Sequence, residues 1–71
     1  MTDIVHVSVF TDRLHVKLTD GQRSLLKEYL DAHSLCYHAA YHGIIVVHGK
    51  PGQLYKLLVE MSWMYPALLV N

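Results

Sequence analysis

The sequence predicts a small α+β domain in which two helices cover one face of an antiparallel sheet. Three observations lead to this class: two alternating segments at the start, two amphipathic helical segments further on, and short apolar segments between and after the helices. From the second strand onward the order is βαββαβ, the ferredoxin-like two-layer sandwich, with an extra N-terminal strand before it. A single α+β domain is expected over residues 1–71.

The first two strands are predicted at residues 4–10 and 13–18, which alternate with a period of two and indicate a hairpin with a tight turn. Because Thr11-Asp12 is not a turn pair that such hairpins prefer, a longer and looser loop is the alternative. If Phe10 pairs with Arg13, one face of the hairpin is purely aliphatic. That face carries Val5, Val7, Val9, Leu14, Val16 and Leu18. The other face is mostly polar, as expected for an antiparallel pair with one side on a core.

The first helix is predicted to begin at residues 19–22, TDGQ, which match the capping box. In this motif a Thr side chain accepts from a backbone N–H and a Gln side chain returns the bond. Apolar and aromatic residues at helical spacing define its buried side: Leu25, Leu26, Tyr29, Leu30 and His33. The helix should end near His33 or Ser34.

Residues 35–41 and 44–48 flank the pair His42-Gly43 and predict a second hairpin, because Gly in the second position suits positive φ. The β-branched run at 44–47 does not alternate with polar residues, which indicates a strand that is covered on both faces or partly buried by a partner. After the break at 49–52, the second helix is predicted to run to about residue 64, with Pro51 in its first turn. Residues 67–71 form the last strand.

The extra strand conflicts with the plain ferredoxin-like topology. The strand with which it forms a hairpin is central there and already has two neighbours. The extra strand must therefore displace one neighbour, merge with its partner or join another chain.

Composition and charge restrict the classes of function that the sequence allows. Hydrophobic residues make up 52% of the chain, and six basic residues balance six acidic ones. A net charge of zero disfavours binding driven by phosphate neutralisation or by an anionic membrane, and it favours association. The apolar runs are too short to span a membrane, and the start of the chain lacks the pattern of a signal peptide. Cys36 is the only cysteine, which fits a reducing compartment, so we expect a cytoplasmic protein.

Chemistry-bearing motifs are weak, and we predict no enzyme activity, no cofactor and no metal site. Five possible zinc ligands lie within sixteen positions, but their spacing follows no standard finger or ribbon; they are His33, Cys36, His38, His42 and His48. Cys36 has only His38 near it as a base, and no orienting group.

A nucleic-acid interface is the second hypothesis. The polar face of the first hairpin offers Phe10, Arg13, His15 and Lys17 for base stacking and phosphate contact. The GxxG at residues 49–52, which includes Lys50, resembles the loop with which KH domains clamp a nucleic-acid backbone. That loop needs a helix before it, however, and residues 44–47 form a poor helix. The simpler interpretation is a β-to-α turn.

The second helix gives the sharpest hypothesis, because it has two apolar stripes. The first is a broad arc that faces the core: Leu54, Leu57, Leu58, Met61, Met64 and Tyr65. The second is a flank formed by Tyr55, Val59 and Trp63, in which Tyr and Trp are residues enriched at interaction hot spots. The alternative is that this flank packs on the first helix, beside Tyr29 and His33.

From the sequence we therefore expect a non-enzymatic protein-interaction module, an adaptor or an inhibitor of another protein, that forms a homodimer or higher homo-oligomer through Tyr55, Val59 and Trp63. This character is shared with small phage and mobile-element proteins that modulate host enzymes. The alternatives are a single-stranded nucleic-acid-binding domain and a regulatory domain that binds a small ligand, the latter on fold analogy alone.

Overall fold

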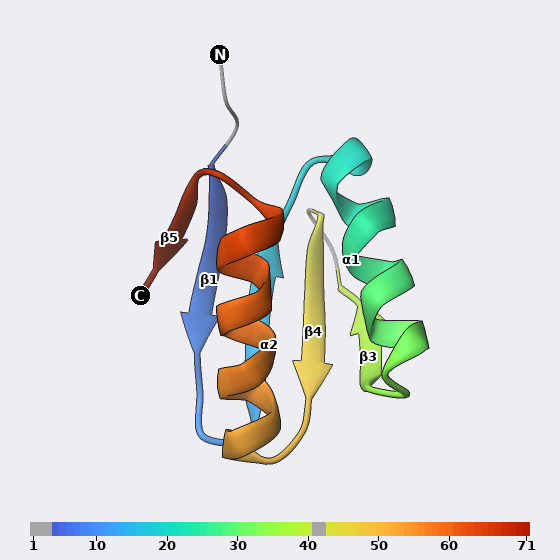
Figure 1. Cartoon of the computed structure of the whole chain (residues 1–71), viewed down its shortest axis with the longest axis vertical. Helices are drawn as coiled ribbons and strands as arrows, with labels where there is room; N and C mark the ends of the chain where they lie inside the picture. Colours follow the sequence, from blue (N-terminus) through green and yellow to red (C-terminus); the bar gives the residue numbers. More distant parts are fainter. Residues whose placement is uncertain (1–3, 41–42) are drawn as a thin grey trace.

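Two helices lie against one face of a five-stranded sheet in the computed structural model, which describes residues 4–40 and 43–71 (Figure 1). The strands are β1 (Val5–Val9), β2 (Arg13–Lys17), β3 (Cys36–Ala39), β4 (Ile44–His48) and β5 (Leu68–Val70). The helices are α1 (Asp20–Ala32) and α2 (Pro51–Met64). The predicted α+β class and the placement of both helices on one face are confirmed.

The strand order is β3-β4-β2-β1-β5, so the N-terminal strand lies between β2 and β5. β1 pairs with β2 in antiparallel and with β5 in parallel orientation. The prediction of an antiparallel sheet is therefore wrong: the sheet is mixed. The cause is that β1 takes the edge of β2 through their short hairpin, and β5 reaches the free edge of β1 running in the same direction. Of the three possibilities expected for the extra strand, the structure shows the first: β1 takes the place of one neighbour of its hairpin partner β2.

The first hairpin has the predicted register. Val9 lies opposite Leu14, and the Phe10 N–H donates to the Arg13 carbonyl at 2.9 Å. The aliphatic face of the hairpin is buried under the helices, except at its tip, where Val9 stays about half exposed. The hairpin thus provides one side of the core, and the turn end of β1 is left partly uncovered.

The core lies between the sheet and the helices. Its buried members are Val5, Val7, Leu14, Val16, Leu18, Leu26, Leu30, Ile45, Val47, Leu54, Leu57, Met61 and Tyr65. Val46 points to the opposite, open face of the sheet but is only 6% exposed. Its cross-strand neighbours there are His15 on β2 and His38 on β3. The prediction that this strand is covered on both faces is confirmed, and we attribute the cover on the open face to these imidazoles.

Helix α1 starts with the predicted capping box. The Gln22 N–H donates to Thr19 Oγ1 at 3.4 Å, and the Thr19 N–H donates to Gln22 Oε1 at 3.0 Å. The helix ends at Ala32 with His33 as C-cap, as predicted. Leu25 and His33 were assigned to the buried side, and both assignments are wrong, because Leu25 is 44% exposed and His33 is exposed as well. A helix lying on a sheet buries a narrow stripe, here at Leu26 and Leu30, and Leu25 is turned about 100° away from Leu26.

The second hairpin is shorter than predicted, because β3 covers only Cys36–Ala39. The Ala40 N–H donates to the Ile44 carbonyl at 2.8 Å, which leaves three residues, 41–43, between the paired positions. Gly43 has φ +74°, the positive value expected of the glycine in this turn. The other turn residue, His42, and the end of the predicted strand at Tyr41 lie outside the described residues.

Helix α2 has the predicted limits and the predicted proline in its first turn. The GxxG before it follows strand β4 directly, so it is a β-to-α turn. After the helix, Tyr65 is buried, and its hydroxyl donates to the Gln22 carbonyl at 2.7 Å. This bond joins the end of α2 to the first turn of α1.

Candidate functional site

The outward face of α2 carries two large aromatic side chains in solvent. Tyr55 is 71% exposed and Trp63 is 73% exposed, while Val59 between them is half-buried. Residues at i, i+4 and i+8 lie on one helix face, and this face is opposite the core-facing Leu57 and Met61. We call Tyr55, Val59 and Trp63 the α2 stripe.

The α2 stripe does not pack on α1, so that alternative is wrong. The side of α2 that faces α1 is polar instead: Gln53 and Lys56 line a small hollow together with Tyr29, His33 and Leu35. Burial and the nearby Glu60 carboxylate both raise the pKa of Tyr29, so Glu60 also lies toward α1. Polar residues thus fill the space between the helices and leave the aromatic residues outside.

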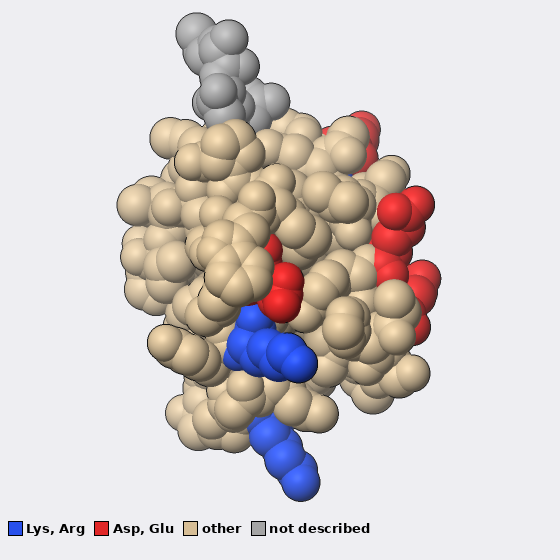
Figure 2. Space-filling model, in the orientation of Figure 1, with Lys and Arg blue, Asp and Glu red and all other residues tan. Residues whose placement is uncertain are grey.

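Little polar surface interrupts the stripe. The Ser62 hydroxyl, beside Trp63, donates to the Val59 carbonyl at 2.6 Å, so it is satisfied within the helix. On the helix-bearing side of the molecule, acidic side chains gather along α1, and both acidic and basic side chains also lie over α2 (Figure 2). The three stripe residues are themselves uncharged and have Lys56 and Glu60 of the same helix beside them, and an apolar centre with a polar border is the arrangement expected of a protein interface.

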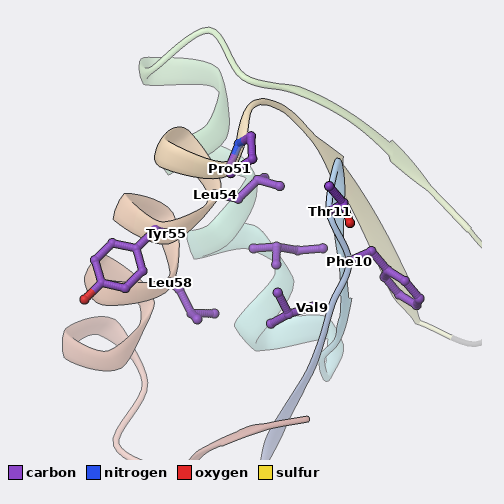
Figure 3. Close-up of a pocket in the computed structure, with 8 residues that line it drawn as sticks. Val9, Phe10, Thr11, Pro51, Leu54, Tyr55 and Leu58 are labelled. Carbon is purple, nitrogen blue, oxygen red and sulfur yellow. The ribbon is translucent and has the colours of Figure 1, made fainter.

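An apolar groove of about 260 Å³ opens beside Tyr55, between the start of α2 and the tip of the first hairpin. Its lining is apolar apart from Thr11 and the Tyr55 hydroxyl; it consists of Val9, Phe10, Thr11, Leu14, Pro51, Leu54, Tyr55 and Leu58. Leu54, Leu58 and Val9 point into the space between helix and strand, while the Tyr55 and Phe10 rings point outward at opposite rims (Figure 3). The groove and the α2 stripe therefore form one continuous apolar surface that shares Tyr55.

Sequence reasoning missed this groove. Val9 and Leu58 were assigned to the core, and Pro51 to a helix start only.

The open face of the sheet holds most of the predicted nucleic-acid residues. The Arg13 guanidinium lies 4.5 Å from the Phe10 ring centroid, and its Nε donates to His15 Nε2 at 3.3 Å. The Phe10 and His15 rings are 4.7 Å apart. Lys17 is exposed two positions further along β2, but Lys50 is the N-cap residue of α2 and its backbone belongs to the helix layer. The structure brings three of the five residues together.

This open-face cluster has little free positive charge. The Asp12 carboxylate is 2.8 Å from Arg13 Nη1 and neutralises part of its charge. Phe10 is in contact with both Arg13 and His15, which already occupy part of its ring surface. Phosphate attraction and base stacking are both weakened as a result.

Two of the possible zinc ligands, for which no metal site was predicted from the sequence, also meet on the open face. His38 Nδ1 and His48 Nε2 are 3.2 Å apart, and both side chains are exposed. Within residues 4–40 and 43–71, no three His, Cys, Asp or Glu side chains gather as a metal-ligand group. Nor is any helix in this part of the chain long and apolar enough to cross a membrane.

Comparisons of the chain with known protein families, with curated protein sequences and with solved structures give no significant match. The α2 stripe, the groove and the open sheet face are therefore the features of the molecule from which we infer a function.

Proposed function

We propose that this chain is a small non-enzymatic protein-interaction module that binds other proteins through the α2 stripe and the adjoining groove. The observation that carries the proposal is the exposure of Tyr55 and Trp63 on one helix face. Exposed contiguous apolar surface of this kind marks interaction sites, and Trp and Tyr supply a large share of binding energy at interfaces. Such a module acts as an adaptor, or as an inhibitor that occupies another protein's surface.

In the purified protein, a second copy of the chain is the partner that the same surface accepts. Tyr55 and Trp63 are each four residues from Val59. If two α2 helices cross in antiparallel orientation at Val59, a two-fold axis brings Trp63 of each chain against Tyr55 of the other. The groove beside Tyr55 then receives an aromatic ring. This is the self-complementary contact that a symmetric dimer requires.

The expected affinity is modest. Burying the exposed parts of both aromatic side chains on both chains removes on the order of 560 Å² from water, taking about 200 Å² per side chain. At about 25 cal/mol per Å² this amounts to roughly 14 kcal/mol. Association costs an estimated 4–15 kcal/mol, so the net free energy is that of a weak dimer in which each ring matters.

Sedimentation equilibrium over a wide concentration range tests the proposal. Trp63→Ala and Val59→Asp should each weaken self-association at least tenfold, with unchanged far-UV circular dichroism. Leu25→Ala is the matched control, because it removes an exposed apolar side chain from α1, outside the stripe. A wild-type chain that stays monomeric at every concentration, or a Trp63→Ala variant that associates like wild type, contradicts the self-association. A pull-down from cell lysate tests the adaptor or inhibitor role. A partner protein that wild type and Leu25→Ala retain should be lost with Trp63→Ala.

Two finer assignments belong to the same proposal. We propose that β2-α1-β3-β4-α2-β5 is a ferredoxin-like unit with β1 inserted between β2 and β5; the helix placement and the strand order support this. We also propose that the protein works in the cytoplasm, which suits the exposed free thiol of Cys36.

Single-stranded nucleic-acid binding is the second candidate, and the contacts among Phe10, Arg13 and His15 favour it. Binding of a labelled oligonucleotide should then fade steeply with salt and fall in both Phe10→Ala and Arg13→Ala. No binding at low salt would remove this candidate. An aromatic-centred protein contact, in contrast, depends little on salt.

A further inference from the structure

We propose that His38 and His48 form a binding site for a divalent late transition-metal ion, with Zn²⁺ as the reference ion. The site lies on the open face of the sheet, at the edge formed by β3, and is separate from the α2 stripe.

The sheet itself sets the spacing of the two imidazoles. In the β3–β4 ladder Cys36 lies opposite His48 and His38 lies opposite Val46. His38 and His48 are therefore diagonal neighbours on one face, a separation that long side chains bridge. Their rings are stacked with centroids 5.1 Å apart and planes 24° apart. Because both side chains start from paired strands, metal binding needs no backbone rearrangement.

The distance between the nitrogens fits chelation. Zinc binds imidazole nitrogen at about 2.0–2.1 Å, so two nitrogens 3.2 Å apart subtend an angle of about 100° at a shared ion. This value lies between the right angle of an octahedral site and the angle of a tetrahedral one. Without metal, one hydrogen must lie between His38 Nδ1 and His48 Nε2. When the ion binds, that hydrogen moves through solvent to the other nitrogen of its own ring, so both imidazoles stay neutral, and each exposed ring rotates until its free lone pair points at the ion.

The surroundings tolerate a cation. The nearest basic residue in the ladder is Arg13, which lies opposite His48 on β2. Its guanidinium forms an ion pair with Asp12 at 2.8 Å and lies over the Phe10 ring, so part of its charge is already balanced. Imidazole suits zinc, copper and nickel alike, and zinc adds no redox chemistry that would oxidise the thiol of Cys36.

The protein supplies two ligands, and the remaining coordination positions stay open to water or to a donor group of a bound molecule. A closed structural zinc site has four protein ligands. The open positions distinguish the site at His38 and His48 from a closed structural site. They predict that zinc exchanges readily and binds much more weakly than it does in a zinc finger.

Calorimetric titration of the full chain with ZnCl₂, with the thiol kept reduced, tests the assignment. His38→Ala and His48→Ala should each weaken zinc binding at least tenfold and abolish the rise in melting temperature that zinc gives the wild type. His6→Ala and Cys36→Ser are the matched controls and should bind within about twofold of wild type. His6 is an exposed histidine on the same face, on β1, and Cys36 is the neighbouring donor opposite His48.

Circular dichroism without zinc verifies that each variant is folded. Failure of the wild-type chain to bind zinc overturns the proposal, as does equal loss in all four variants, which would indicate adventitious binding. A loss in Cys36→Ser as large as in the histidine variants contradicts the two-histidine site.

Discussion

Replacing Tyr65 with Phe removes one hydroxyl that joins the two helices. The ring is buried, and its hydroxyl donates to the Gln22 carbonyl at 2.7 Å, across 43 residues of chain. A net hydrogen bond of this kind contributes about 0.5–1.5 kcal/mol. The carbonyl lies within α1, where the Leu26 N–H is its ordinary helical partner, so it is not left without a donor. We therefore expect a loss of about 1 kcal/mol, or roughly 4–8 °C in melting temperature for a domain of this size.

The same substitution should change the alkaline stability profile. Burial raises the pKa of Tyr65 above its ordinary value of about 10, although the nearby Leu26 backbone N–H lowers it in part. The neutral hydroxyl is thus favoured in the fold. The contribution of the neutral Tyr65 hydroxyl to stability is fully present below pH ~10. It is lost as the pH rises through the higher pKa of the folded state, because Tyr65 ionises first in the unfolded chain. The difference in free energy of unfolding between wild type and Tyr65→Phe should be constant around neutral pH and should become smaller above pH ~10.

Urea unfolding followed by far-UV circular dichroism measures both effects. Tyr55→Phe is the matched control, since it removes the same hydroxyl from a side chain that is 71% exposed, and it should leave the stability unchanged at low protein concentration. Equal stability of Tyr65→Phe and wild type at pH 7 would refute the reasoning. If the difference in free energy of unfolding does not become smaller at high pH, burial does not raise the pKa of Tyr65.

Two further predictions concern the core and the second turn. Leu57→Ala should lower the free energy of unfolding by about 2–5 kcal/mol, because the side chain is buried. Leu25→Ala, at an exposed position, should lower it by no more than about 0.5 kcal/mol. Similar losses for the two variants in urea titrations would contradict the burial of this face of α2. Gly43→Ala should destabilise by about 1–2 kcal/mol, because φ is +74° and the new Cβ would lie 3.1 Å from the Leu18 carbonyl oxygen. Gly52→Ala, in open space within α2, should stabilise by about 0.4–1 kcal/mol, and thermal melts that show the same sign for both glycines would contradict this.

Features that depend on neighbouring residues were predictable from sequence. Thr19 and Gln22 identify the start of α1 because the capping box closes within four residues, and the hairpin of β1 and β2 has its register because only two residues separate its paired ends. The start of α2 at Pro51 follows the same local logic.

The position of β1 was not predictable, because strand order depends on contacts between distant segments. β1 and β5 are separated by most of the chain, and nothing in either segment specifies their parallel pairing. The polar contact between the helices was also hidden. Gln53 and Lys56 line the hollow next to α1 and leave Tyr55 outside, and nothing in their sequence positions indicates this contact.

The meeting of His38 and His48 shows how a single residue of register decides a site. A two-residue turn at 42–43 would place His38 opposite Val47, on the core side of the sheet. The observed ladder is shifted by one residue, and it places His38 opposite Val46 on the open face, beside His48. A shift of one residue in an antiparallel pair moves a side chain to the other face, so sequence spacing alone could not assign this pair.

The pairing of β1 with β5 also determines how the fold responds to mechanical force. The first and last strands are parallel neighbours, and their backbone bonds include Val5 N–H to the Ala67 carbonyl and Asn71 N–H to the Val7 carbonyl. A pull that separates Ile4 from Asn71 acts along both strands and loads these bonds in shear, so they must break together. Peeling the bonds apart one at a time would require a perpendicular pull. The inserted strand thus places a mechanical clamp between the two ends of the described fold.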